Sequence, residues 1–123
     1  MSPEDVVRKF CQAVARADVR ELAAFFTEDA VYHNIPLAPV SGRAAIEATL
    51  AQFIAPGARV EFELKGLATR DALVLTERVD RFEMMGKSVA LPVAGVFQVR
   101  NGKIAAWRDY FDMQTWMTQT GMS

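Results

Sequence analysis

The chain has 123 residues, of which 51% are hydrophobic and 24% are charged, and 14 Lys and Arg against 15 Asp and Glu leave a formal net charge of −1. This length and composition predict one folded domain over residues 1–123 and exclude a disordered chain. The near-neutral charge, with no cluster of Lys and Arg, excludes an electrostatic surface for nucleic acid or for an anionic membrane.

Two helices are predicted at the start of the chain. Ser2 can cap the first helix, Pro3 suits its first turn, and apolar residues recur at helical spacing over residues 6–17. Residues 18–21 have the pattern of a capping box and predict a short second helix, which we expect to include Phe26. Each helix has one apolar face, which must pack against another layer of the protein.

A brief strand and a third helix are expected next. Residues 30–34 have the pattern of a short strand. A helix is predicted from about residue 43 to residue 54, because Ile46 and Leu50 belong to an apolar stripe at helical spacing. The Ala-Pro-Gly sequence at residues 55–57 should end this helix, because proline lacks the amide hydrogen that a helix interior needs.

The second half of the chain predicts an antiparallel sheet. From residue 58 onward apolar residues recur at every second position, as in a strand with one solvated face. Strands are predicted at about residues 58–65, 73–84, 89–99 and 104–112, with a turn at residues 86–87 and a short closing helix at 113–117. Asn101-Gly102 favours the positive φ angles of a type I′ turn. These elements predict an α+β fold in which helices cover the concave face of a curved sheet.

Three charged residues lie on strand faces that the alternation assigns to the interior. Arg78 and Asp80 share the more apolar face of the strand at 73–84, and Asp109 lies among aromatic residues in the strand at 104–112. Because isolated buried charges cost several kcal/mol, we expect Arg78 to lie between the two carboxylates and to compensate them. The pattern is consistent with a catalytic pair of carboxylates and with a salt-bridge network that has no chemical role.

The brief strand at residues 30–34 supplies further polar side chains. Tyr32 and Asn34 share one face, where a phenol and an amide can hold a water molecule together. His33 faces the other way, and as a single histidine without a partner it is expected to be a surface or packing residue. Cys11, the single cysteine, lies near the apolar face of the first helix and is expected to belong to the core.

Four segments taken together closely resemble the limonene-1,2-epoxide hydrolase family, at residues 32–37, 76–80, 95–98 and 107–112. The resemblance covers about residues 24–116, and its Arg-x-Asp and Trp-Arg-Asp-Tyr-Phe-Asp motifs are far more specific than the fold. It implies the cone-shaped α+β fold of nuclear transport factor 2 and ketosteroid isomerase, with N-terminal helices packed on a curved, mixed, mostly antiparallel sheet that encloses a pocket. The chain departs from some members at its start, where their longer leader is lacking.

The resemblance also implies a role for each of five polar residues. Asp80 is implied as the general acid and Asp109 as the general base, with Arg78 as the bridge between them. Tyr32 and Asn34 are implied as the residues that hold the water molecule. The implied reaction adds water to a hydrophobic epoxide in one step and gives a vicinal diol.

The residue types suit this chemistry. Opening an epoxide with water needs a proton donor and a proton acceptor at once, because the leaving alkoxide is a strong base and water is a poor nucleophile. A free Asp titrates near 3.9, so we expect burial to raise the pKa of Asp80 until it can serve as an acid. The residues expected to line the substrate pocket are Phe82, Leu91, Val93, Phe111 and Trp116.

Three other functions stay open at this point. An isomerase of the ketosteroid type uses a carboxylate base with a tyrosine and a protonated aspartate, and Tyr32, Asp80 and Asp109 could supply these groups. Arg78 argues against this isomerase, because a cation beside Asp80 favours its ionised form. A polyketide cyclase has the same fold, and a non-catalytic domain that binds small molecules could also use it.

The sequence also bears on cofactors, partners and location. A single cysteine and a single histidine exclude a Cys/His zinc site, and no Gly-rich loop for phosphate is present, so we expect neither a metal nor an organic cofactor. No apolar run reaches the roughly 18 residues of a membrane span, and the acidic start is unlike a signal peptide. We therefore expect a cytoplasmic protein without nucleic acid or membrane as partners. The family resemblance implies a small hydrophobic epoxide and water as partners. It also implies a homodimer.

Overall fold

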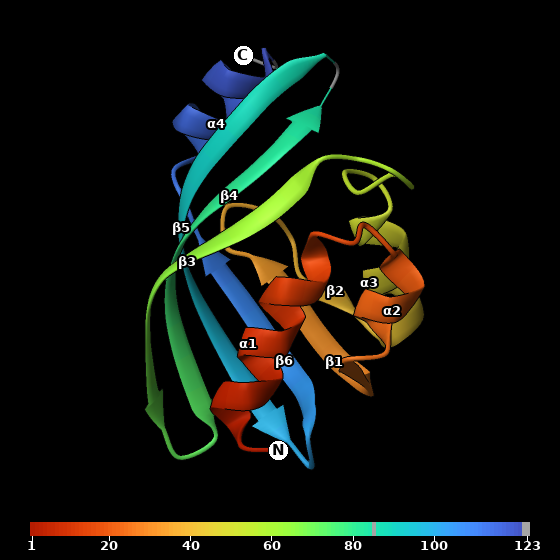
Figure 1. Ribbon diagram of the computed structural model, residues 1–123, viewed down its shortest axis with the longest axis vertical. Helices are drawn as coiled ribbons and strands as arrows, with labels where there is room; N and C mark the ends of the chain where they lie inside the picture. The colour runs from red at the N-terminus through yellow and green to blue at the C-terminus, as the bar shows by residue number, and fades with distance from the viewer. Residues whose placement is uncertain (85, 122–123) are drawn as a thin grey trace.

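The computed structural model describes residues 1–84 and 86–121, which form one mixed sheet with helices packed around it (Figure 1). The helices over these residues are α1 (Pro3–Val14), α2 (Val19–Ala23), α3 (Arg43–Leu50) and α4 (Met113–Thr120). The strands are β1 (Phe26–Asn34), β2 (Val40–Ser41), β3 (Val60–Arg70), β4 (Leu73–Met84), β5 (Lys87–Arg100) and β6 (Lys103–Tyr110).

The sheet has six strands in the order β2-β1-β6-β5-β4-β3. β1 runs parallel to β6, and all other neighbouring strands are antiparallel. Consecutive hairpins therefore connect β3 to β6. β1, which precedes these strands in the sequence, pairs with the edge of β6 that does not pair with β5. The predicted α+β architecture is confirmed, with a sheet that twists strongly and curves around α1 (Figure 1).

The first two helices start at the capping residues that the sequence predicts. The Ser2 hydroxyl accepts a hydrogen bond from the Asp5 amide, and the Asp5 carboxylate accepts one from the Ser2 amide, which completes a capping box at the start of α1. The Asp18 carboxylate caps α2 by accepting from the amides of Arg20 and Glu21. α4 follows a third cap, because Asp112 accepts from the Thr115 amide.

All four predicted helix ends differ from the structure: the first helix ends at Val14 rather than near residue 17, and α4 continues to Thr120, three residues beyond its predicted end. Phe26 does not belong to the second helix but begins β1, since it pairs with Ile104 of β6 across the parallel pair. That pairing links residues far apart in the chain, so the local pattern does not contain it. The third helix ends at Leu50 rather than at Ile54, because the amides of Gln52 and Phe53 bond three residues back and tighten the last turn.

The strand predictions are largely confirmed, with differences at the ends. Asn101 and Gly102 have φ angles of 51° and 78°, as the predicted type I′ turn requires. Gly86 has a φ of 76° in the turn before β5, which begins at Lys87. β3 continues five residues beyond its predicted end because a register shift after Leu64 breaks the alternation while the pairing with β4 continues.

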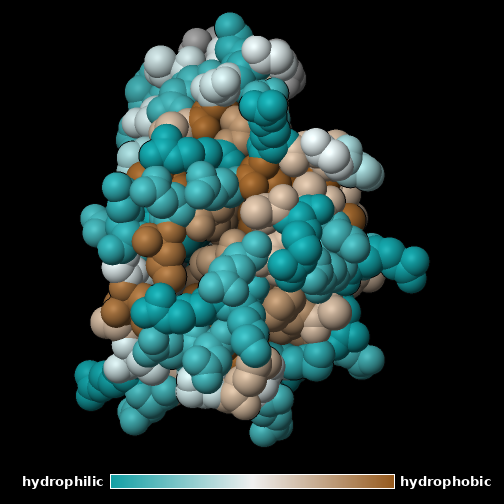
Figure 2. Space-filling view, viewed as in Figure 1, coloured by the Kyte–Doolittle hydropathy of each residue, from teal (hydrophilic) through white to brown (hydrophobic). Residues whose placement is uncertain are grey.

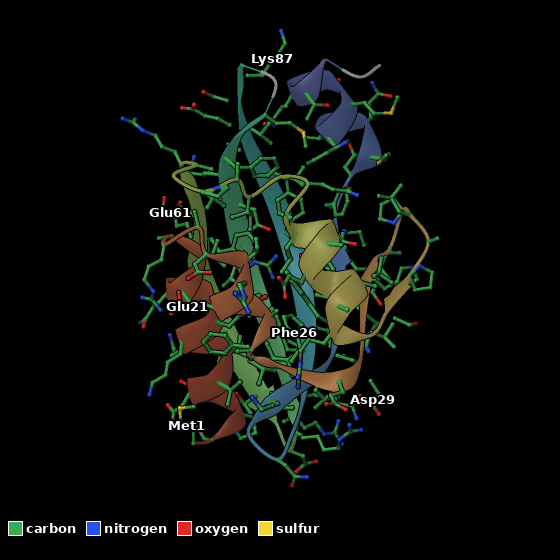
Figure 3. The ribbon with its side chains drawn as sticks, turned by 90° about the vertical axis from the view of Figure 1, so that its right-hand side faces the viewer. Met1, Glu21, Phe26, Asp29, Glu61 and Lys87 are labelled. Atoms are coloured by element: carbon green, nitrogen blue, oxygen red, sulfur yellow. The ribbon has the colours of Figure 1, made fainter. Side chains whose placement is uncertain are left out.

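The core lies between α1 and the concave face of the sheet. The fully buried Phe10 of α1 makes edge-to-face contacts with the fully buried rings of Phe26, Phe97 and Trp107, with centroids 5.1 to 6.0 Å apart. Figure 3 shows Phe26 in the interior between the helices and the sheet, while the charged Glu61 and Lys87 lie at the periphery. Hydrophilic residues cover most of the face shown in Figure 2, and apolar residues reach the surface mainly in its middle.

Candidate active site

Two strands bring the three predicted charged residues together. Arg78 and Asp80 lie on β4 and Asp109 lies on β6, and β5 pairs with both strands and separates them. The alternation predicts correctly that all three point to the interior, because Arg78, Asp80 and Asp109 are 1%, 5% and 3% exposed. The predicted face of each strand is therefore confirmed.

Arg78 contacts both carboxylates at once. Its Nε and Nη2 donate to Oδ1 and Oδ2 of Asp80 at 2.9 and 2.8 Å, which is a bidentate contact. Its Nη1 and Nη2 donate to Oδ1 and Oδ2 of Asp109 at 3.2 and 2.8 Å, which is a second bidentate contact. Nη2 is thus shared between the two aspartates, and the planar guanidinium fixes their separation and orientation.

Two aromatic rings contact the guanidinium of Arg78. The Arg78 Cζ atom lies 4.8 Å from the centre of the Phe62 ring and 5.8 Å from that of the Phe97 ring. These are cation–π contacts, which favour the charged form of the buried arginine. The Thr76 hydroxyl accepts from Arg78 Nη1 at 3.1 Å and donates to the Gly95 carbonyl oxygen at 3.2 Å.

Burial and charge shift the titration of the cluster. Burial raises the pKa of Asp80 from 3.8 to about 6, since the bonds and charge of Arg78 oppose this effect only in part and Asp109 adds to it. Burial acts to lower the pKa of Arg78, but the charges and hydrogen bonds of Asp109 and Asp80 hold it well above its ordinary value. The expected rise in the pKa of Asp80 agrees in direction with the structure.

Tyr32 and Asn34 reach the same site from β1. The parallel pairing places Tyr32 beside Trp107 and Asn34 beside Asp109, and both side chains line the cavity that also contains the two aspartates. Burial raises the pKa of the Tyr32 hydroxyl, and the charge of Asp109 adds to the rise, so this hydroxyl keeps its proton. His33 faces away, as expected, with Nε2 2.9 Å from the Leu37 carbonyl oxygen.

The cavity has a volume of about 160 Å³ and a mostly apolar wall. Its lining includes every pocket residue expected from the sequence, namely Phe82, Leu91, Val93, Phe111 and Trp116. It also includes residues that were not anticipated, namely Leu37, Thr49, Gln52, Phe53, Phe62, Met84 and Met113. Several of these come from α3, the turns after it and α4, which close over the open side of the sheet. Tertiary contacts of this kind leave no periodic signal in the sequence.

Trp107 and Gly95 also contact the charged cluster, although neither was predicted as a site residue. The Trp107 Nε1 donates to Asp109 Oδ1 at 2.7 Å. Gly95 pairs with Thr76 on one side and Asp109 on the other, and a Cβ there would collide with Arg78 Nη1 and lie 2.6 Å from Asp109 Oδ1. A glycine inside an otherwise apolar strand is the signal that could have identified this close approach.

The described residues 1–84 and 86–121 hold no group of three or more His, Cys, Asp or Glu side chains placed to bind a metal ion. Over the same part of the chain, no helix is long and apolar enough to cross a membrane. The polar groups that could do chemistry in the cavity include two carboxyl groups joined by one arginine. Such a set can donate a proton and accept a proton within one reaction step.

Comparisons with known proteins agree with this geometry. The family model of the limonene-1,2-epoxide hydrolase catalytic domain matches residues 1–122. The epoxide hydrolase EphG of Mycobacterium tuberculosis is 34% identical over 109 residues, which cover 87% of this chain and 71% of that protein.

Solved structures are also similar to this chain. A limonene-epoxide-hydrolase-like epoxide hydrolase from M. tuberculosis superimposes with a TM-score of 0.82 at 28% identity, covering 96% of this chain and 88% of the other. A protein with a ketosteroid isomerase-like fold from Catenulispora acidiphila has the same TM-score at 21% identity, covering 98% and 95% of the two chains, and shows the fold alone. On the family match and the mycobacterial relatives, the chain belongs to the limonene-1,2-epoxide hydrolase family and is an epoxide hydrolase of that type.

Proposed function

We propose that this enzyme adds water to a hydrophobic epoxide in one acid–base step, with Asp80 as the acid and Asp109 as the base. The observation that carries the proposal is the double bidentate contact of Arg78 with two buried carboxylates at the end of an apolar cavity. A structural salt bridge gains nothing from a second buried carboxylate, which costs desolvation. A concerted acid and base need two carboxylates held at a fixed distance.

In the proposed step, two proton transfers accompany the opening of the epoxide ring. A water molecule held by Tyr32 and Asn34 gives a proton to Asp109 as its oxygen bonds to one ring carbon. The bond between that carbon and the epoxide oxygen breaks, and Asp80 gives its proton to the oxygen that leaves. The carbon under attack inverts, and the product is a vicinal diol. The cycle closes when a proton returns from Asp109 to Asp80, so the enzyme is unchanged.

The wall of the cavity supports a hydrophobic substrate. Its residues are mainly aromatic, aliphatic and methionine side chains, which favour an apolar ligand and exclude bulk water. A dry site strengthens the interaction between the developing alkoxide and the acid, since fewer water dipoles screen it. The substrate class that fits is an epoxide with an apolar frame.

An isomerase of the ketosteroid type is the weaker candidate. It needs a carboxylic acid that stays protonated and donates a hydrogen bond to an oxyanion. The family model that matches residues 1–122 and the relative that is 34% identical are both of epoxide hydrolases, which favours hydrolysis over isomerisation. The ketosteroid isomerase-like neighbour resembles this chain in fold, which does not identify the reaction.

Assaying diol formation with a panel of hydrophobic epoxides tests the proposal. We expect turnover without added cofactor, and dialysis against a chelator should leave it intact. No diol from any epoxide, or activity that one metal restores after chelation, contradicts the proposal. A homodimer, which the family resemblance implies, and a cytoplasmic location, which the sequence predicts, are separate predictions that size-exclusion chromatography and fractionation would test.

Labelling with heavy-oxygen water distinguishes the proposed route from a covalent one. With enzyme in excess over substrate, a single turnover should place the label in the diol, because water itself attacks the ring. Label that enters only after several turnovers would indicate an ester at Asp80 or Asp109.

A further inference from the structure

Trp107 has a polar contact that packing does not explain. It is the largest fully buried side chain of the protein, and its indole N–H donates to Asp109 Oδ1 at 2.7 Å. The two residues are two positions apart on β6, so both side chains face the same side of the sheet. Trp107 does not line the cavity, whereas Asp109 does.

The hydrogen bonds make the two oxygens of Asp109 different. Oδ1 accepts from Trp107 Nε1 and from Arg78 Nη1, which uses both of its in-plane lone pairs. Oδ2 accepts from Arg78 Nη2, the single donor that the described residues provide to it, and so keeps one lone pair. The free lone pair for a water molecule therefore belongs to Oδ2.

The indole ring also positions Tyr32. The two rings are stacked with centroids 4.1 Å apart and planes 13° apart, and Phe97 stacks on the other side at 5.5 Å and 16°. Both neighbours are direct cross-strand partners of Trp107, one on β1 and one on β5. One rigid side chain thus contacts both the base and a residue that holds the water.

We propose that Trp107 is a positioning residue that fixes Oδ2 of Asp109 as the oxygen that accepts the proton and aligns Tyr32 with it. The proposal rests on the proposed function and deepens it by naming the reacting atom of the base. Without the indole N–H, a proton on Oδ1 competes with a proton on Oδ2, and the carboxylate can turn away from the water.

Trp107→Phe tests the proposal, because it keeps a flat ring for stacking and deletes the donor. We expect kcat to fall by about 10- to 100-fold, as a hydrogen bond to a charged group is lost, with little change in KM since Trp107 does not touch the cavity. The acid-side limb of the pH–rate profile should move to higher pH. The other titratable groups facing Asp109, which are Arg78, Asp80, Tyr32 and Cys11, are the same in both proteins.

Phe26→Leu is the matched control for packing. Phe26 is fully buried and stacks on Trp107 at 5.9 Å, but it has no polar group and does not line the cavity. The Phe26→Leu substitution should lower the melting temperature and leave the pH–rate profile unchanged. Trp107→Phe with normal kcat and a normal pH profile overturns the positioning role, while wild-type protein that forms no diol contradicts the proposed function instead.

A measurement on the intact protein covers the case in which Trp107→Phe does not fold. In an NMR spectrum of 15N-labelled protein, the indole N–H signal of Trp107 should move downfield from the usual position and should shift in Asp109→Asn. The Trp116→Phe spectrum assigns the two indole signals. A Trp107 signal that is the same in wild type and Asp109→Asn overturns the proposal.

Discussion

Two arginines lie three residues apart on β4 and make the same kind of contact. Arg78 Nη2 is 2.8 Å from Asp80 Oδ2, and Arg81 Nη2 is 2.8 Å from Glu63 Oε1 on β3. The side chain of Arg78 is 0% exposed and that of Arg81 is 47% exposed, because residues at even and odd positions of a strand face opposite sides. The two pairs differ in burial rather than in bond length.

The carboxylates of the two pairs respond in opposite directions. The hydrogen bond from Arg81 lowers the pKa of the exposed Glu63, while burial raises the pKa of Asp80 to about 6 despite two bonds from Arg78. At the solvated pair the nearby arginine has the larger effect on the carboxyl pKa. In the core the cost of desolvating the carboxylate outweighs the effect of the arginine. The same arginine–carboxylate contact therefore accompanies a lowered carboxyl pKa at the solvated pair and a raised one at the buried pair.

Removing either buried carboxylate should have the largest effect. Asp80→Asn and Asp109→Asn should each lower kcat/KM by about 10³-fold, within the range that one proton transfer contributes. The fold should survive, since the amide is nearly isosteric and removes a buried charge. Glu63→Gln is the matched control on the exposed face and should leave both activity and melting temperature unchanged. Near-normal turnover in either buried variant would reduce the cluster to a structural salt bridge.

The second-largest difference is expected when each of the two arginines is replaced by lysine. Arg78→Lys keeps the charge but loses the planar fork that reaches both aspartates, so we expect kcat/KM to fall by about 10²-fold or more. Arg81→Lys should have no effect on diol formation, because Glu63 lies outside the cavity. Equal activity in the two variants would show that charge alone, and not the shape of the guanidinium, is required.

Gly95→Ala should disturb the buried pair without changing any charged residue. The added Cβ would collide with Arg78 Nη1 and crowd Asp109 Oδ1, so the carboxylate must shift. We expect activity to fall by about 10- to 100-fold, as small displacements of reacting groups do, together with a lower melting temperature. Kinetics and thermal unfolding of the variant would check this, and normal activity in a folded variant would show that the cluster tolerates displacement.

The raised pKa of Asp80 predicts a smaller effect through pH. If Asp80 donates the proton, kcat/KM should decline above about pH 6, by up to tenfold per unit, as the acid ionises. The native state holds this proton more tightly than the unfolded chain, so the stability from Asp80 is full below about pH 4 and is lost as pH rises through about 6. Melting temperatures of wild type and Asp80→Asn across this range should differ in slope, and parallel curves would contradict the assignment.

Part of this site could be predicted from the sequence, because alternation in strands is a local signal. It identified Arg78, Asp80 and Asp109 as charges facing the interior, and the pairing of β4 and β6 with β5 confirms their faces. The alternation also placed Tyr32 and Asn34 on one face, where they can hold a water molecule together, and the family resemblance added the roles of acid and base for the two aspartates.

The rest depends on contacts between distant parts of the chain. The parallel pairing of β1 with β6 brings Tyr32 beside Trp107, and no local pattern determines which strand β1 joins. Phe26 was assigned to a helix for the same reason. The hydrogen bond of Trp107 requires the rotamer of a buried ring, and the role of Gly95 requires the space around it. Neither property can be obtained from residue type and spacing.

The double variant Asp80→Asn/Asp109→Asn tests most directly that the two carboxylates act together in one step. If the acid and the base work in a single transition state, loss of one already removes most of the benefit of the other. The kcat/KM of the double variant should then lie close to that of either single variant. It should be far above the kcat/KM expected if the two fold-losses multiplied. Losses that multiply would mean that Asp80 and Asp109 act independently, and would contradict a concerted acid–base pair held by Arg78.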